Sequence, residues 1–383
     1  MDTSYILNHL GEDHEDYFNA VAPPIIQTSN FCFKSVREFR KALKDEQRSS
    51  IYTRGNNPTV AILRKKLAAL EGAEDALVFS SGSAAIAAAI MSVVKGGDHV
   101  ICINRPYSWT NTLLNEYLIN YNVATTMVEG TKTENFEKAI QPNTKLIYLE
   151  SPDTLTLNLQ DIRAITRIAK QNNIVTIIDN SYCTPLNQKP LAMGVDIVVY
   201  SGTKYFGGHS DIVAGIVCSS TERISKMFKE EFMTFGAIPS PHDAWLMIRG
   251  LRTLELRVNR SCISAQKVVN FLEKHPQIEE VFYPFAKKNK QLALAKKQMK
   301  QGGGLITILI KAKSPAQIET FCDNLKYFLL AVSWGGHESL VFPVCVNKNN
   351  KTLPWNMVRL YIGLEDPALL IDDLNQALIL SKE

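Results

Sequence analysis

The sequence predicts an α/β protein with a doubly wound, mostly parallel seven-stranded sheet and a second, smaller α/β domain. Short apolar runs alternate with helical patterns between residues 59 and 218, which is typical of strands joined by helical crossovers. The chain has 383 residues, whereas a single domain usually has about 100–200. We therefore expect two domains, in agreement with a hydrophobic content of 45%.

The seven strands are predicted from short apolar runs that are flanked on both sides by turn-forming residues. They are Ala76–Ser80, Asp98–Asn104, Val123–Val128, Lys145–Glu150, Ile174–Asp179, Ile197–Ser201 and Val213–Cys218. The segments between them have apolar residues at intervals of three and four, which indicates helices. The predicted helices are Thr59–Gly72, Ser83–Val94, Asn111–Ile119 and Leu159–Gln171.

The pattern changes after Ala244, where one long helix, extending to about Glu273, leads into a second region. Further elements are predicted in this region: strands near Val281, at Leu305–Ile310 and at Arg359–Ile362, and a last helix at Ala368–Leu380. We expect an N-terminal arm at residues 1–50, a large domain at 51–245 and a C-terminal domain at 246–383.

Charge and cysteine patterns argue against several classes of function. The net charge is only +4 with scattered Lys and Arg, so no nucleic-acid partner is expected. The seven Cys form no pair at metal-ligand spacing, and no metal site is predicted. No apolar run reaches the roughly 20 residues that span a membrane, and the N-terminus lacks a secretion signal. A cytoplasmic protein without a membrane partner is expected.

Three segments follow predicted strands, where ligands bind in doubly wound sheets. Ser81, Gly82 and Ser83 precede a helix, and free amides there favour an anion, although a plain strand–turn–helix junction explains them equally well. Asp179 ends an apolar strand and is either a helix cap or a functional charge. Lys204 follows the next strand among small residues, although a lysine in that place is usually solvated.

Asp179 and Lys204 lie 25 positions apart, an arrangement similar to that of pyridoxal-phosphate (PLP) enzymes with the aspartate aminotransferase-like fold. A partly desolvated lysine amine can form an imine with an aldehyde. A carboxylate beside the pyridine nitrogen keeps that nitrogen protonated, so that the ring can accept electrons. The hydroxyl groups of Ser201 and Thr203, together with the amides near Gly82, would hold the phosphate.

The chain resembles the Cys/Met metabolism PLP-dependent enzymes, the family of cystathionine lyases and synthases, over nearly its whole length. The motifs that carry this resemblance are Tyr52–Thr59, Ser81-Gly82, Tyr107, Glu150–Pro152, Asp179-Asn180, Ser201–Asp211, Arg249–Leu254, Ser333–Leu340 and Arg359–Asp366. So many motifs in family order make the resemblance specific.

The resemblance implies a role for each of five residues. Lys204 would carry pyridoxal 5'-phosphate as a Schiff base and move the proton of the substrate α-carbon. Asp179 would pair with the pyridinium, and Tyr107 would stack on the ring and take part in proton transfer. Arg359 would clamp the substrate α-carboxylate, with Ser333 beside it.

The resemblance also implies a homo-oligomer whose active sites are shared between subunits. Tyr52 and Arg54 would reach the phosphate in a neighbouring subunit, so that at least a dimer, and commonly a tetramer, is required. Trp334 and Thr154 would lie on the substrate side. Thr154 stands where relatives often have Asn. Ser108-Trp109 follow the stacking Tyr where relatives often have Gly-Gly or Gly-Cys, so the contacts of Thr154 and Trp109 are open.

The reaction is predicted from several local features. Ser333-Trp334-Gly335-Gly336 and the missing Asn-Pro, where this chain has Thr154-Leu155, both resemble bacterial cystathionine β-lyases. Val332 replaces the Glu of γ-enzymes that handle cystathionine, and Trp109 replaces the Cys that methionine γ-lyases favour. We therefore predict a β-lyase that releases pyruvate, ammonia and a thiol from cystathionine or a related small sulfur amino acid. The alternative is a γ-acting member: a cystathionine γ-synthase, a γ-lyase or an O-acetylhomoserine sulfhydrylase type. The third hypothesis, a non-catalytic PLP-binding regulator, is disfavoured by the intact Lys204, Asp179 and Arg359.

Overall fold

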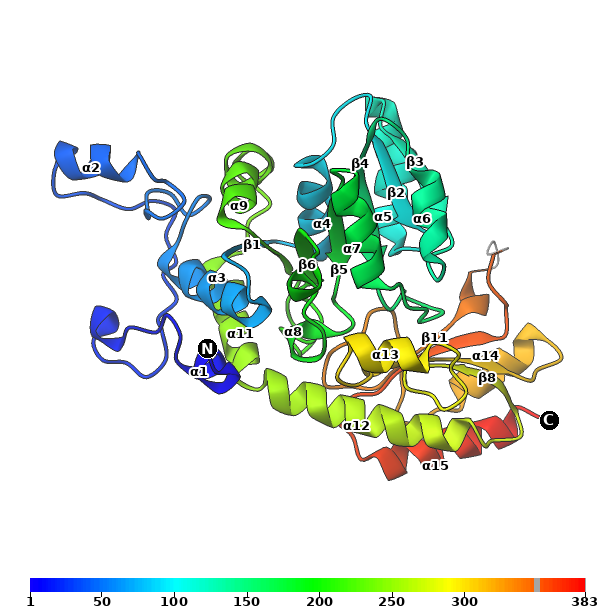
Figure 1. Ribbon diagram of the computed structural model, residues 1–383. Coiled ribbons are helices and arrows are strands. Elements are labelled where there is room, and N and C mark those ends of the chain that lie inside the picture. The colour runs from blue at the N-terminus through cyan, green and yellow to red at the C-terminus, as the bar shows by residue number, and fades with distance from the viewer. Residues whose placement is uncertain (348–351, 383) are drawn as a thin grey trace.

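The computed structural model describes residues 1–347 and 352–382, which form two β-sheets (Figure 1). Within that part of the chain the larger sheet has seven strands, in the order β1-β7-β6-β5-β4-β2-β3. They are β1 (Asp75–Phe79), β2 (His99–Ile103), β3 (Ala124–Val128), β4 (Thr144–Glu150), β5 (Val175–Asp179), β6 (Ile197–Ser201) and β7 (Gly215–Ser219). Only β7 runs against the other six. The predicted mostly parallel sheet is confirmed.

Helices pack against the strands of the larger sheet in the way that the alternating pattern predicts. Helix α3 (Pro58–Glu71) packs against β1, α4 (Gly82–Met91) against β6 and β7, and α7 (Ile162–Gln171) against β5. Every residue of β2 and β7 is buried. Strands of this kind are covered on both faces and read as continuous apolar runs, which is why the sequence reveals them.

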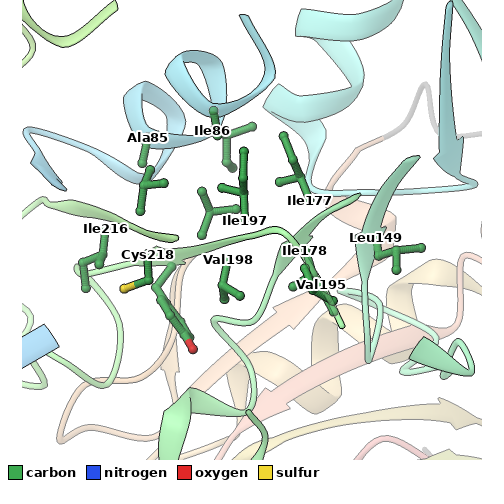
Figure 2. Packing of buried hydrophobic residues seen from close by; sticks show 14 of the residues in the cluster. Ala85, Ile86, Leu149, Ile177, Ile178, Val195, Ile197, Val198, Ile216 and Cys218 are labelled. Atoms are coloured by element: carbon green, nitrogen blue, oxygen red, sulfur yellow. The ribbon is translucent and has the colours of Figure 1, made fainter. Parts of the chain in front are cut away.

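The core of the larger sheet is built from β-branched side chains that alternate between its faces. Figure 2 shows Ile86 of α4 above Ile177 and Ile197, whereas Val198 and Cys218 point to the opposite face. Val198 and Cys218 are direct partners across β6 and β7. This packing fixes the strand ends that carry the polar residues of the site.

A second sheet follows, with the strand order β10-β11-β12-β9-β8 in the described residues. Its strands are β8 (Ile278–Phe282), β9 (Leu305–Ile310), β10 (Leu329–Leu330), β11 (Leu340–Pro343) and β12 (Met357–Tyr361). Helices α14 (Pro315–Asp323) and α15 (Pro367–Leu380) pack together, and α15 also runs beside α12 (Leu254–Leu272) (Figure 1). The α/β character of this region is confirmed, while the boundaries at residues 50 and 245 stay a prediction.

The single long helix expected from Ala244 to Glu273 is wrong. The structure has α11 (Pro241–Arg252) and α12, separated at Thr253, whose φ and ψ are −109° and 7°. The Arg257 guanidinium donates to the Gly250 carbonyl (2.7 Å) and the Thr253 hydroxyl (3.0 Å). These bonds stabilise the break, because they satisfy a carbonyl that a continuous helix would pair internally.

The lack of periodicity and the pair Pro23-Pro24 predict an extended N-terminal arm, but the arm is not wholly extended. It contains the short helices α1 (Thr3–Asn8) and α2 (Val36–Ala42), and α2 extends away from both sheets (Figure 1). Among the described residues, no helix combines the length and the apolar character needed to cross a membrane.

Candidate active site

A cavity of about 720 Å³ is lined by residues of both sheets. The larger sheet contributes the carboxyl ends of β4, β5 and β6, and the second sheet contributes β11, β12 and the loop before β11. Twelve of the predicted site residues line it: Ser81, Gly82, Ser83, Tyr107, Thr154, Asp179, Ser201, Thr203, Lys204, Ser333, Trp334 and Arg359. The topology therefore brings together residues up to 278 positions apart, from Ser81 to Arg359.

Lys204 lies in the turn after β6, and its side chain is directed toward the second sheet. Its amine donates to the Ser333 hydroxyl and lies 5.3 Å from the centroid of the Trp334 ring. Burial, together with the nearby positive charge of Arg359, lowers the pKa of the Lys204 amine to about 8. An amine with this pKa is partly neutral, and hence nucleophilic, near physiological pH.

Asp179 is the last residue of β5 and does not cap a helix, because the next helix, α8, begins only at Thr184. Its Oδ1 accepts from the Ser181 amide at 2.9 Å. Burial raises the pKa of the Asp179 carboxyl, while the bonds from Ser181 and the charge of Lys204 oppose that rise. The functional-charge interpretation is the one that this geometry favours.

Arg359 on β12 is a half-buried cation that has no carboxylate within 4 Å among the described residues. Its Nη2 donates to the Ser333 carbonyl at 3.3 Å, and its guanidinium lies 5.2 Å from the Phe342 ring centroid. Burial lowers the pKa of the guanidinium to about 10. Because a charge that is partly withdrawn from water is costly without a counter-ion, Arg359 is suited to hold the carboxylate of a ligand.

Ser333 connects these two cations. Its hydroxyl accepts from Lys204 and its carbonyl accepts from Arg359. The backbone of Ser333 has φ +74°, in the left-handed region that a residue with a side chain seldom adopts. The two bonds are what hold this conformation in place.

The loop before α4 could hold a phosphate. Ser81 caps α4, its hydroxyl accepting from the Ala84 amide at 3.0 Å. Gly82 lies against Ser201, since a Cβ on Gly82 would come within 3.2 Å of the Ser201 hydroxyl. The Thr203 hydroxyl, in contrast, is already engaged with the backbone of Ala214. Free amides at a helix N-terminus beside a serine suit an anion.

Tyr52 and Arg54 do not line the cavity. The Arg54 guanidinium lies 5.5 Å from the centroid of the Tyr52 ring, and that ring is 45% exposed. Their predicted role in a neighbouring subunit therefore stays a prediction.

Sequence reasoning missed several residues that line the cavity. Glu150 ends β4 as Asp179 ends β5, so the signal that selected Asp179 was also present there. Phe342 lies in β11 and Val344 comes directly after it. The sequence did not predict this strand. To find these two residues one needs the order of the strands and the extent to which each side chain is buried, and only the structure supplies both.

The site defines an enzyme in which a lysine amine, a half-buried carboxylate, a helix N-terminus and a guanidinium line one cavity. This donor set fits pyridoxal phosphate, because an aldehyde, a pyridine nitrogen and a phosphate each have a matching group. Residues 3–379 match the Cys/Met metabolism PLP-dependent enzyme family, and the chain belongs to that family.

The relatives agree over almost the full length. An L-methionine gamma-lyase of Fusobacterium nucleatum is 38% identical over 375 residues, which is 95% of each chain. A cystathionine gamma-lyase of Macaca fascicularis is 37% identical over 380 residues, covering 97% of this chain and 92% of that protein. The crystal structure of metB from Corynebacterium glutamicum is similar with a TM-score of 0.93 and 34% identity, covering 99% of this chain and 98% of that one. The predicted PLP-dependent fold and cofactor are confirmed.

Proposed function

We propose that this chain is a PLP-dependent lyase that cleaves the Cγ–S bond of a sulfur amino acid. The observation that carries the proposal is that Lys204, Asp179 and Arg359 line one cavity in a chain 38% identical to L-methionine gamma-lyases. The β-lyase prediction has weaker support, because the relatives compared above are γ-lyases. The γ-acting alternative is therefore preferred.

Each of the three residues has a distinct task in the proposal. Bound pyridoxal phosphate supplies an aldehyde that joins amines and a ring that withdraws electrons from the α-carbon. Asp179 holds a proton on the ring nitrogen, and Arg359 orients the substrate by its α-carboxylate. Lys204, whose pKa is lowered to about 8, takes the proton of the α-carbon. A base with a pKa near the working pH is the most effective one.

Cleavage at the γ-carbon requires two further proton movements. A proton leaves the β-carbon, and the departing sulfur accepts one as the Cγ–S bond breaks. The Lys204 amine and the Tyr107 phenol, both at the cavity, are the groups proposed for these movements. With one water consumed, methionine would yield 2-oxobutyrate, ammonia and methanethiol.

The wall of the cavity favours an uncharged sulfur side chain. Apolar side chains are grouped there: Trp109, Leu155, Val332, Phe342, Val344 and Leu353. The Asp153 carboxylate in the same wall already accepts from the amides of Leu155, Thr156 and Leu157. The described lining has two other carboxyl groups, Glu150 and Asp179, which accept from the amides of Tyr107 and Ser181. We therefore propose methionine-like thioethers rather than cystathionine.

The test is to incubate the purified protein with methionine and, separately, with cystathionine, and to identify the keto acid. We expect 2-oxobutyrate from both, with the higher kcat/KM for methionine. Pyruvate from cystathionine would restore the β-lyase hypothesis, and no keto acid from either substrate would leave a synthase, a sulfhydrylase or a non-catalytic protein. Lys204→Ala serves as the inactive control. The cytoplasmic location and the shared-site homo-oligomer stay predictions, which a native mass measurement addresses for the oligomer.

A further inference from the structure

Glu150 and Asp179 form a pair of carboxyl groups at the carboxyl ends of two central strands of the larger sheet. They are the last residues of the neighbouring parallel strands β4 and β5 and are direct partners in register. Residues so paired point their side chains to the same face, with the strands about 4.8 Å apart. The preceding pair, Leu149 and Ile178, lies side by side in Figure 2. Both carboxyl groups line the cavity.

The two groups have different partners. Asp179 accepts from Ser181 and interacts with the charge of Lys204. Glu150 is only 7% exposed and has no Lys, Arg or His within 4 Å in the described part of the chain. Its Oε2 instead accepts from the backbone amide of Tyr107 at 2.7 Å. Glu150 is therefore aimed at a backbone group of the site.

The segment that Glu150 contacts needs such support. Arg105 has φ +60°, a left-handed conformation that costs a non-glycine residue roughly 1 kcal/mol. Pro106 has no amide to donate, so the Tyr107 amide is the next donor after this bend. Tyr107 is also the N-cap residue of the five-residue helix α5 (Ser108–Thr112) and has no side-chain cap bond. The bond from Tyr107 to Glu150 ties the start of α5 to the sheet.

We propose that Glu150 is a positioning residue, whose carboxyl group fixes the Tyr107 amide and thereby sets the place of the Tyr107 ring beside the cofactor. The inference rests on the PLP site of the proposed function, but not on which carbon–sulfur bond is cleaved. Glu150 acts through Tyr107 and touches no reacting atom.

The charge of the pair follows from the same geometry. Burial, and after it the charge of Asp179, raises the pKa of the Glu150 carboxyl well above its usual range. At Glu150 the Tyr107 amide opposes this rise, whereas at Asp179 the bonds from Ser181 and the positive charge of Lys204 oppose the corresponding rise. A neutral amide of the same shape can replace Glu150, because its carbonyl oxygen accepts the same bond.

The experiment compares Glu150→Gln and Glu150→Leu by hydrogen exchange of peptides covering residues 104–112, measured by mass spectrometry on the cofactor-free and the loaded protein. In Glu150→Leu the Tyr107 amide should exchange about tenfold faster, and pyridoxal phosphate should dissociate about tenfold more readily. Glu150→Gln should keep both values within about twofold. Asp179→Asn is the matched control, since it alters the pair without touching the Tyr107 bond and should leave the exchange of the cofactor-free protein unchanged.

Two results would overturn the proposal. One is that amide exchange at residues 104–112 is unchanged in Glu150→Leu. The other is that exchange and cofactor dissociation rise equally in Glu150→Gln and Glu150→Leu, because this would assign the effect to the charge of Glu150. If Glu150→Leu does not fold, Glu150→Gln decides alone, because tenfold faster exchange there contradicts the proposed acceptor. Exchange in the cofactor-free protein does not depend on catalysis, so a failure of the proposed reaction leaves this test intact.

Discussion

Gly335 packs directly against the backbone of Lys204. A Cβ built on Gly335 would lie 2.9 Å from both the Cα and the Cβ of Lys204, and φ of Gly335 is +90°. The loop that presents Ser333 to the Lys204 amine therefore rests on the turn that carries Lys204. Only glycine satisfies both the contact and the backbone conformation.

Gly335→Ala is expected to lower kcat for methionine by at least about tenfold, because the new methyl group displaces the backbone of Lys204 and misplacing a reacting group by about 1 Å can cost a hundredfold. Steady-state kinetics and thermal unfolding measure the two effects. Gly97→Ala is the matched control, since Gly97 has φ +95° but nothing within 4 Å of its Cβ position. It should lose about 1 kcal/mol of stability and keep its kcat. Equal kcat values in the two variants would contradict the contact.

The Lys204 amine of the cofactor-free protein should react with an amine-selective acylating reagent with a midpoint near pH 8. The neutral amine is the reactive form, so the rate rises as pH increases through the pKa. Arg359→Met removes a positive charge that lowers this pKa, and the midpoint should move upward. Peptide mapping by mass spectrometry across pH 6–11 measures the modification of Lys204. A midpoint at the ordinary lysine value of 10.5 in the unmodified sequence would argue against a desolvated amine.

Glu71 should make stability depend on pH. Glu71 ends α3 and accepts a hydrogen bond from the Tyr200 hydroxyl, and burial raises the pKa of its carboxyl from 4.5 to about 7. The folded state retains the proton that the unfolded state loses, so the stabilisation is complete below about pH 4.5 and is lost as pH rises to about 7.

Glu71→Gln should therefore remove up to about 3 kcal/mol of pH-dependent stability between pH 4.5 and 7. The measurement is the unfolding midpoint of both proteins across this pH range. The slope of stability against pH is compared, because this slope does not depend on the absolute effect of the substitution on stability. Glu137→Gln on the exposed side of α6 (Thr133–Ala139) is the control. Parallel curves for the original protein and Glu71→Gln would show that the carboxyl does not titrate there.

Lys66→Ala should release the N-terminal helix α1. The Lys66 amine is fully buried, forms a 3.0 Å ion pair with Glu12 and donates to the carbonyl oxygens of Ile6 and Leu7. Removing one partner of a buried pair costs about 3–5 kcal/mol. Limited proteolysis within the first 20 residues and the thermal unfolding midpoint measure the effect. Lys65→Ala, at the exposed neighbouring position, should change neither of them.

Much of the larger sheet could be predicted because most of its strands are buried on both faces, and β4, β5 and β6 end at polar residues. The same reasoning found Asp179, Ser201 and Lys204, which lie at or just after strand ends. It passed over Glu150, although Glu150 ends β4 in the same way, because no local pattern shows that two strand ends are neighbours.

The second region was harder to predict for physical reasons. β10 has only two residues, and Leu329 and Leu330 are both more than half exposed, so no alternation or buried run marks it. The break at Thr253 depends on Arg257 and on the close approach of the Gly250 backbone to the Phe206 carbonyl. Contacts between residues distant in sequence decide such features, and helical periodicity does not contain them.

The position of β1 at the edge of the larger sheet has a consequence for how the protein is made. β1 is synthesised first among the seven strands, yet within the described residues it pairs only with β7, the last of the seven to leave the ribosome. Gly215 at the start of β7 also lies against the Ser81 carbonyl. A nascent chain that stops short of Gly215 thus carries an open strand edge and an unsupported anion loop, so chaperone binding during translation should persist until β7 emerges.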